Sequence, residues 1–114
     1  MTIIHVYLDD WRACPPGFAL ARNGEECLML LRECKVGILS LDYELGPDVM
    51  NGGDVAAAIV REQLYPEEIF LHTSSPSGRT RMYEMLYQHK PLGVKVHHGP
   101  MPAEYLKNAG YSEA

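Results

Sequence analysis

The sequence predicts an α/β protein with a flavodoxin-like, three-layer fold whose five parallel strands follow the order 2-1-3-4-5. Short apolar runs alternate along the chain with segments of helical periodicity, which is typical of parallel strands joined by right-handed crossovers. Acidic residues directly follow the first and third apolar runs, and open α/β sheets bind ligands at that edge. A chain of 114 residues is long enough for one domain, residues 1–114, with a core of its own.

The first three elements surround an unusual connection. Residues 3–8 form the first strand, and because both of its faces are largely apolar, we expect both to be covered. Residues 9–17 contain Pro15-Pro16-Gly17, so the first helix is expected to be short or missing. A short strand follows at residues 18–21. Asn23 is a suitable N-cap for the next helix, whose apolar face consists of Cys27, Leu28, Leu31 and Cys34.

The rest of the chain repeats the strand–helix alternation. We expect strands at residues 37–41, 68–73 and 93–97. We expect helices at residues 54–65 and 79–89, and a helical turn at residues 104–107. Pro66 and Pro91 end the two helices.

The composition of the chain narrows the range of possible functions and partners. The net charge of −5 argues against a broad nucleic-acid surface, which needs a basic face, but it is compatible with a small phosphorylated ligand held through a metal ion. Three cysteines are an odd number and do not suggest a disulfide framework. The chain shows no signal segment and no apolar run near the ~20 residues of a membrane span. We therefore expect a soluble, cytoplasmic protein without membrane partners.

Three carboxylates are expected to meet at the carboxyl edge of the sheet. Asp9 and Asp10 end the first strand and Asp42 ends the third, and these two strands are neighbours in the predicted order. Three such groups within a few Å cannot all stay ionised without a compensating cation. Mg²⁺ (or Mn²⁺) is the usual cation for an all-oxygen site, so Asp9, Asp10 and Asp42 are the predicted metal ligands. The alternative is that Asp9 and Asp10 only cap a turn.

A second polar segment follows the fourth strand. Hydroxyls and free amides at a helix start, here Ser74, Ser75 and Gly78, favour an anion. Arg79 adds a bidentate phosphate donor, and His72 can transfer a proton near neutral pH. The alternative is a capped helix next to a buried histidine.

Three features near the end of the chain leave alternatives open. Lys95 either reaches the same edge of the sheet and contacts phosphate, or is solvated. His97 and His98 are adjacent in a strand and should point to opposite faces, so they should not share a metal ion. Tyr83 and Tyr87, if exposed, would suit a homodimer interface.

Several motifs resemble one known family. They are Leu8-Asp9-Asp10 with Arg12 and Pro15, Ser40-Leu41-Asp42 with Leu45 and Gly46, Gly52 with Asp54 and Val55, and His72 with Pro76, Gly78, Arg79 and Met82. In this set the sequence resembles the cyclic-phosphate processing receiver domain, a relative of response-regulator receivers. The resemblance implies a receiver-like fold and a role on cyclic phosphates, such as RNA 2′,3′-cyclic phosphate ends.

The chain departs from the family pattern at a few positions. Tyr43 stands where the family has histidine, and Glu44 replaces an aspartate. Thr73 and Ser75 replace a serine and an asparagine. If the missing histidine is the family's acid or base, catalysis is weakened or lost here, unless Ser74 and His72 substitute for it.

These residues are consistent with three functions. The first is a metal-dependent phosphoesterase for a small phosphorylated ligand or RNA end, with Asp42, His72 and Ser74 as catalytic residues and Ser75, Gly78, Arg79 and Lys95 as phosphate-binding residues. The second is a response-regulator-like receiver that accepts phosphate on Asp42, although no Lys-Pro pair follows the fifth strand. The third is an inactive binding module of the same fold.

Overall fold

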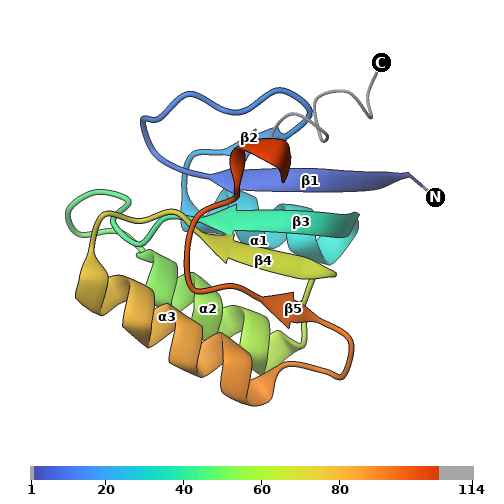
Figure 1. Ribbon diagram of the computed structural model, residues 1–114. Helices are drawn as coiled ribbons and strands as arrows, with labels where there is room; N and C mark the ends of the chain where they lie inside the picture. The colour runs from blue at the N-terminus through green and yellow to red at the C-terminus, as the bar shows by residue number, and fades with distance from the viewer. Residues whose placement is uncertain (1, 106–114) are drawn as a thin grey trace.

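Five parallel strands form one sheet in the order β2-β1-β3-β4-β5, as the sequence predicts (Figure 1). The computed structural model describes residues 2–105. The strands are β1 (Ile3–Leu8), β2 (Ala19–Ala21), β3 (Lys35–Leu41), β4 (Glu68–Leu71) and β5 (Lys95–Val96). The helices are α1 (Gly24–Glu33), α2 (Gly52–Glu62) and α3 (Pro76–His89).

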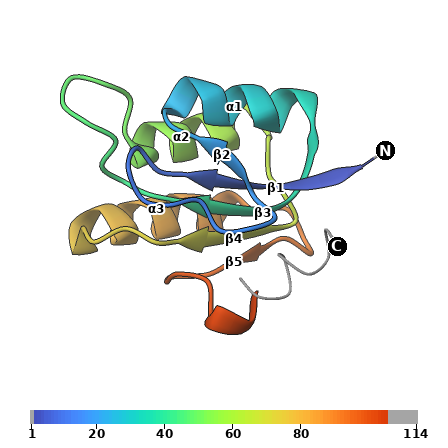
Figure 2. The ribbon, with the colours of Figure 1, turned by 90° about the horizontal axis from the view of Figure 1, so that it is seen from above.

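The helices α1, α2 and α3 pack on one face of the sheet, where the main hydrophobic core lies. Figure 2 shows α1 and α2 on this side of the strands. Alternate residues of the central strands point into this core: Val6, Leu8, Leu39, Leu41, Ile69 and Leu71. α2 lies between α1 and α3 and contacts both, while α3 packs against β4 and β5 through Met82 and Leu86. The sheet therefore buries one face under helices, as βαβ units require.

The opposite face of the sheet has a different cover. Its side chains include Tyr7, Phe70 and His97, and Phe70 stacks on His97 with ring centroids 4.2 Å apart. Phe18 packs edge-on against Tyr7 at 6.4 Å, and Tyr105 packs against Phe70 at 5.0 Å. Within residues 2–105, this face is thus covered by the β1–β2 connection and by a helical turn that begins at residue 103. Both faces are covered, as expected, but only one of them by long helices.

The connection from β1 to β2 contains no helix, which confirms the prediction for this crossover. The predicted turn at residues 104–107 is helical as far as residue 105, and Lys107 lies outside the described residues.

Some element boundaries differ from the prediction because polar caps begin the helices early. α2 begins at Gly52 rather than at residue 54, because Asn51 and Asp54 form a reciprocal capping box. α3 begins at Pro76 rather than at residue 79, because the Ser75 hydroxyl accepts a hydrogen bond from the Gly78 N–H. β4 and β5 are shorter than predicted.

Within residues 2–105, no helix combines the length and the apolar character needed to cross a membrane.

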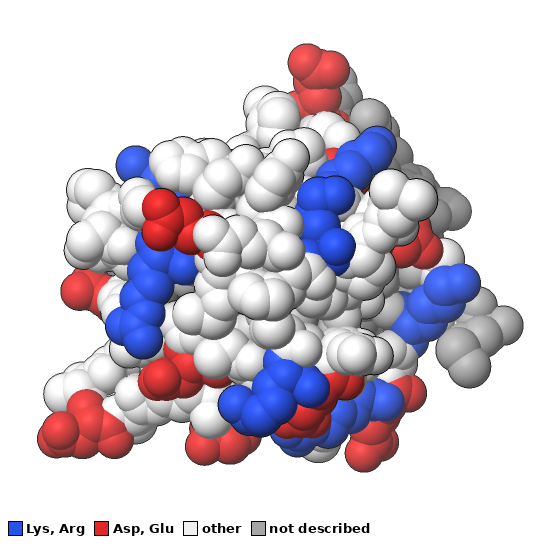
Figure 3. Space-filling model, turned by 90° about the horizontal axis from the view of Figure 1, so that it is seen from below, with Lys and Arg blue, Asp and Glu red and all other residues white. Residues whose placement is uncertain are grey.

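The charges on the surface agree with the composition of the sequence, in which Asp and Glu outnumber Lys and Arg. On the face shown in Figure 3, the Lys and Arg side chains lie in separate groups among Asp and Glu, so that face carries no continuous basic surface.

Candidate functional site

Two of the three predicted carboxylates meet at the carboxyl edge. Leu8 and Leu41 are register partners in β1 and β3, so Asp9 and Asp42 follow them side by side. The Asp42 N–H donates to the Leu8 carbonyl at 3.1 Å, which continues the ladder one residue beyond the strand. Asp9 is fully buried and Asp42 is 4% exposed. Asp10, by contrast, is exposed and takes no part in this group.

Arg12 joins the two buried carboxylates. Its Nη1 atom donates to Asp9 Oδ2 at 2.8 Å and to Asp42 Oδ2 at 3.1 Å. The backbone turns after Asp9 and brings the Arg12 side chain back to the two carboxylates, because Asp9 Oδ1 accepts hydrogen bonds from the N–H groups of Trp11 and Arg12 at 2.9 and 2.8 Å. An aspartate that bonds to the following backbone groups forms a tight turn without a helix. One guanidinium thus lies between two carboxyl groups.

Arg22 fixes this turn from outside. Its Nη1 atom donates to the carbonyl oxygens of Asp9 and Arg12 at 3.2 and 3.1 Å. Arg22 directly follows β2, the strand that pairs with β1, so the sheet itself places the guanidinium next to the turn. The position of Arg12 therefore rests on contacts from two strands.

His72 supports Asp9 from the other side. Its Nε2 atom lies 3.0 Å from Asp9 Oδ2, and its Nδ1 atom lies 2.6 Å from the Ser40 hydroxyl. Because an ionised carboxylate only accepts hydrogen bonds, we assign the proton to Nε2, and the Ser40 hydroxyl then donates to Nδ1. The Tyr7 ring stacks on the imidazole at 4.3 Å with an interplanar angle of 3°. Both ring nitrogens of His72 are thus occupied.

The protonation states follow from this environment. Burial lowers the pKa of His72 and outweighs the opposing effect of Asp9, so the imidazole is neutral at pH 7. Burial by itself would raise the pKa of Asp9, but hydrogen bonds from the Trp11 backbone, from Arg12 and from His72 lower it to about 2. The hydrogen bond to Asp9 raises the pKa of Arg12 further. Asp9 is thus ionised, and Arg12 is its cation.

The polar residues at the start of α3 mainly complete the fold. Ser75 is the N-cap of the helix, and Thr73 Oγ1 accepts a hydrogen bond from the Ser75 N–H at 3.1 Å. Ser74 is exposed. Arg79 Nε is buried and has no hydrogen-bond partner among the described residues. The hydroxyls of Thr73 and Ser75 therefore accept hydrogen bonds from backbone N–H groups at the start of the helix.

Tyr43 occupies the space between the starts of α2 and α3. Its N–H donates to Asp42 Oδ1 at 2.8 Å, but its ring packs against Gly53 and Gly78. A Cβ atom at Gly78 would overlap this ring. The Tyr43 hydroxyl accepts a hydrogen bond from Arg81 at 3.4 Å. Where the family has histidine, this chain thus has an aromatic ring packed between two helices.

Lys95 lies near the opposite edge of the sheet. It pairs with Glu68 at the start of β4, and it lines a hollow with Thr2 and Ile3. The sequence placed Lys95 either at the carboxyl edge or in solvent, and the structure supports the solvated position. His97 stacks on Phe70, whereas His98 contacts Tyr83 of α3, so the two histidines point to opposite faces as expected.

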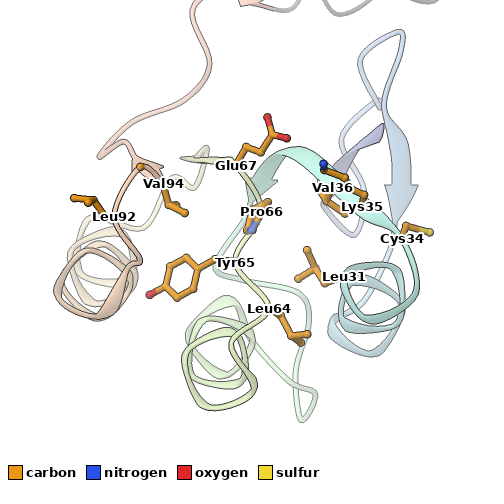
Figure 4. Close-up of a pocket in the computed structure, with 11 residues that line it drawn as sticks. Leu31, Cys34, Lys35, Val36, Leu64, Tyr65, Pro66, Glu67, Leu92 and Val94 are labelled. Carbon is orange, nitrogen blue, oxygen red and sulfur yellow. The ribbon is translucent and has the colours of Figure 1, made fainter. Parts of the chain in front are cut away.

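Two hollows differ in their distance from the carboxylates. The first, about 570 Å³, opens at the amino-terminal edge between the end of α1 and the segments before β4 and β5 (Figure 4). Its wall is mainly apolar and far from the carboxylates. The second, about 410 Å³, adjoins the site itself, because His72 and Ser40 form part of its wall. Its other lining residues are Tyr7, Ala13, Cys14, Pro15, Pro16, Pro100 and Met101.

The predicted metal ion does not fit the arrangement as it stands. Asp9, Asp42 and His72 each offer a ligand atom, and these atoms lie within 4.8 Å of one another. However, Asp9 already accepts four hydrogen bonds, two of them from Arg12. A carboxylate has about four acceptor positions. A divalent ion would have to displace the guanidinium, and Asp10 does not supply the third carboxylate.

The sheet order and the position of the two buried acids define the class: this is a receiver-like α/β domain with its site at the carboxyl ends of β1 and β3. Residues 4–88 match the model of the cyclic-phosphate processing receiver domain, and the chain belongs to that family. No curated protein matches the sequence.

Sequence reasoning did not assign roles to Arg12, Arg22, Ser40 or Tyr7. The spacing Asp9-x-x-Arg12 after a strand was an available signal for Arg12, because an aspartate-initiated turn brings a residue three positions later back to the carboxylate. Arg22, Ser40 and Tyr7 have no such local signal, since their contacts depend on the pairing of β1 with β2 and on the position of His72.

Proposed function

We propose that this domain binds a cyclic phosphodiester at the Arg12–Asp42 pair and opens it by hydrolysis. The observation that supports this proposal is the guanidinium between two buried carboxyl groups, at the ligand-binding edge of a domain from a cyclic-phosphate processing family. A guanidinium recognises phosphate oxygens, and a neighbouring carboxylate can accept the proton of an attacking water. The two required functions are adjacent here.

Arg12 is suited to hold the phosphate. Within residues 2–105, the side-chain hydrogen bonds of Arg12 all use Nη1, so Nε and Nη2 have no partner among these residues. Its side chain is 32% exposed, which leaves that edge accessible to a ligand. A guanidinium fixed through one nitrogen and open at the others is already oriented for two parallel hydrogen bonds to a phosphate.

Asp42 is the candidate base. Water adds to phosphorus, one ester P–O bond breaks, and the proton that leaves the water passes through the carboxylate to the departing alcohol oxygen. Among the described residues, Asp42 accepts one hydrogen bond on each oxygen, from the Tyr43 N–H and from Arg12. It therefore keeps acceptor capacity that Asp9 lacks.

His72 acts in this proposal as a positioning residue. Its two nitrogens bind Ser40 and Asp9, so it fixes Asp9, and Asp9 in turn fixes Arg12. A direct proton transfer from His72 to the substrate would require one of these hydrogen bonds to break. Ser74, the other residue predicted to substitute as acid or base, is exposed.

The hollow beside His72 is the proposed location for the organic part of the substrate. Its volume of about 410 Å³ lies in the range of small-molecule pockets, and its apolar wall with a few polar groups is typical of them. A nucleoside at an RNA 2′,3′-cyclic end would suit such a hollow, because it combines the apolar face of a base with a few polar groups. The substrate class in this proposal is thus a nucleoside cyclic phosphate or an RNA end.

The decisive experiment offers 2′,3′-cyclic nucleotides and RNA with a cyclic end to the wild-type domain, and follows the phosphomonoester product. Asp42→Asn should remove turnover while leaving the fold intact, and Asp48→Asn is the matched control because Asp48 is an exposed acid in the following loop. Wild-type protein without turnover, or full turnover by Asp42→Asn, would refute the proposal.

The same samples test the two other predicted functions. Incubation with a small phosphodonor should add phosphate to Asp42 if the domain is a receiver, although the structure places Lys95 too near the opposite edge to serve as the lysine of such a site. An inactive binding module would neither turn over cyclic phosphates nor accept phosphate.

A further inference from the structure

Arg12 occupies the position that a metal ion would need. Its Nη1 atom is within hydrogen-bonding distance of one oxygen from each buried carboxylate, at 2.8 and 3.1 Å. We infer that the Arg12 guanidinium is the resident cation of this site and excludes a divalent ion, so that the carboxyl edge of the wild-type chain is metal-free and a divalent-cation site appears only when Arg12 is removed.

The first argument is that Asp9 has no acceptor position left. Its Oδ1 atom binds the N–H groups of Trp11 and Arg12, and its Oδ2 atom binds Arg12 Nη1 and His72 Nε2. A metal ion coordinates through the same lone pairs that these donors use. Binding a metal at Asp9 therefore requires at least one of these donors to leave.

The second argument is that Arg12 is anchored more firmly than a surface arginine. Its N–H binds Asp9, its carbonyl oxygen accepts a hydrogen bond from Arg22, and its guanidinium lies 6.0 Å from the centre of the Trp11 ring. Both carboxylates that it joins are buried, and buried charges without a partner are strongly unfavourable. The guanidinium is therefore held in place by the groups that would otherwise bind a metal.

The third argument concerns what remains when Arg12 is absent. Asp9, Asp42 and His72 would then offer two carboxylate oxygens and one imidazole nitrogen within 4.8 Å, once the His72 proton moves from Nε2 to Nδ1, where the Ser40 hydroxyl can accept it. Two oxygens and a nitrogen form a suitable set for Mn²⁺ and similar divalent ions. Without the guanidinium, the two buried carboxylates also need a new cation, so the Arg12 variant should both bind Mn²⁺ and be stabilised by it.

This inference bears on how the proposed hydrolysis works, but its test does not require turnover. Mn²⁺ binding is measured directly by the loss of the free-ion signal in electron paramagnetic resonance, and independently by the melting temperature. If cyclic phosphates are not substrates, the metal titration still decides the role of Arg12. If turnover is found, its persistence in EDTA adds a separate result.

The variants are Arg12→Ala, Arg12→Gln and the double variant Arg12→Ala/Asp42→Asn, with Arg61→Ala as the matched control. Arg61 is 69% exposed and its contact with Glu62 is long, at 3.7 Å. We expect no bound Mn²⁺ in the wild type or the control, one ion per chain in Arg12→Ala and Arg12→Gln, and loss of that ion in the double variant.

If Arg12→Ala is too unstable alone, refolding with Mn²⁺ and failure to refold without it give the same conclusion. A wild type that binds Mn²⁺ as tightly as the Arg12 variants, or Arg12 variants that bind none, would overturn the inference.

Discussion

Asp9 should give the protein a measurable sensitivity to acid. Its carboxylate has a pKa of about 2 in the folded protein against an ordinary value of 3.8, and it is fully buried. A group with a depressed folded pKa stabilises the fold above its unfolded pKa, and this contribution is lost as the pH falls through the folded value. The difference corresponds to about 2 kcal/mol at pH 7. About 1 kcal/mol of it should be lost between pH 7 and pH 3.

The assay is urea unfolding of the wild type and Asp9→Asn over this pH range, with Asp48→Asn as the control for an exposed acid. The stability of Asp9→Asn should fall less on acidification than that of the other two proteins, by about 1 kcal/mol at pH 3. Parallel stability curves for the wild type and Asp9→Asn would show that Asp9 is not the low-pKa group.

Three further changes test the surroundings of the site. Gly52→Ala should lower the free energy of unfolding by about 1–3 kcal/mol, because its Cβ would overlap the Asp42 carbonyl oxygen. Thermal or urea unfolding measures this change, and Gly99→Ala, where the space is open, should have little effect. His72→Phe should lower the free energy of unfolding by about 1–3 kcal/mol, because it leaves the buried Ser40 hydroxyl and Asp9 carboxylate without their shared partner. Equal stability of this variant and the wild type in urea would contradict the proposed role of these hydrogen bonds. Ala13→Trp should raise KM for a nucleoside cyclic phosphate with little change in kcat, since it fills the hollow beside the site; an unchanged KM would place the organic part of the substrate elsewhere.

The sheet and its order were predictable because they follow from a pattern that extends over the whole chain. Apolar runs separated by helical periods leave few topologies, and the Pro-rich segment excluded the first helix. The opposite orientations of His97 and His98 were expected from the alternation of side chains along a strand, and the structure confirms them although β5 ends at Val96. Boundaries were less accurate, because they depend on single hydrogen bonds such as those made by Ser75 and Asn51.

The site was predictable only in part, because side-chain direction beyond a strand end depends on tertiary contacts. Asp9 and Asp10 are equivalent in sequence, yet Asp9 turns inward, where the Trp11 and Arg12 N–H groups bind it, and Asp10 remains exposed. The sequence left Lys95 either at the carboxyl edge or in solvent, because β5 is only two residues long and its register with β4 decides between the two.

The hydrogen bonds at the carboxyl edge form one continuous row, and this continuity holds the side chains of the site in one geometry. Ser40 donates to His72, His72 donates to Asp9, and Arg12 donates to both Asp9 and Asp42, so the row starts and ends on β3 after crossing β4 and β1. Each internal member is bound on two sides, and buried polar groups arranged in this way hold one geometry, because breaking any hydrogen bond leaves a desolvated atom unpaired. Within residues 2–105, the Arg12 guanidinium and the Asp42 carboxylate, at the site end of this row, retain unused hydrogen-bonding capacity. In the proposed reaction the phosphate would therefore bind the guanidinium and the attacking water would bind the carboxylate, while Asp9 and His72 hold these two side chains in place.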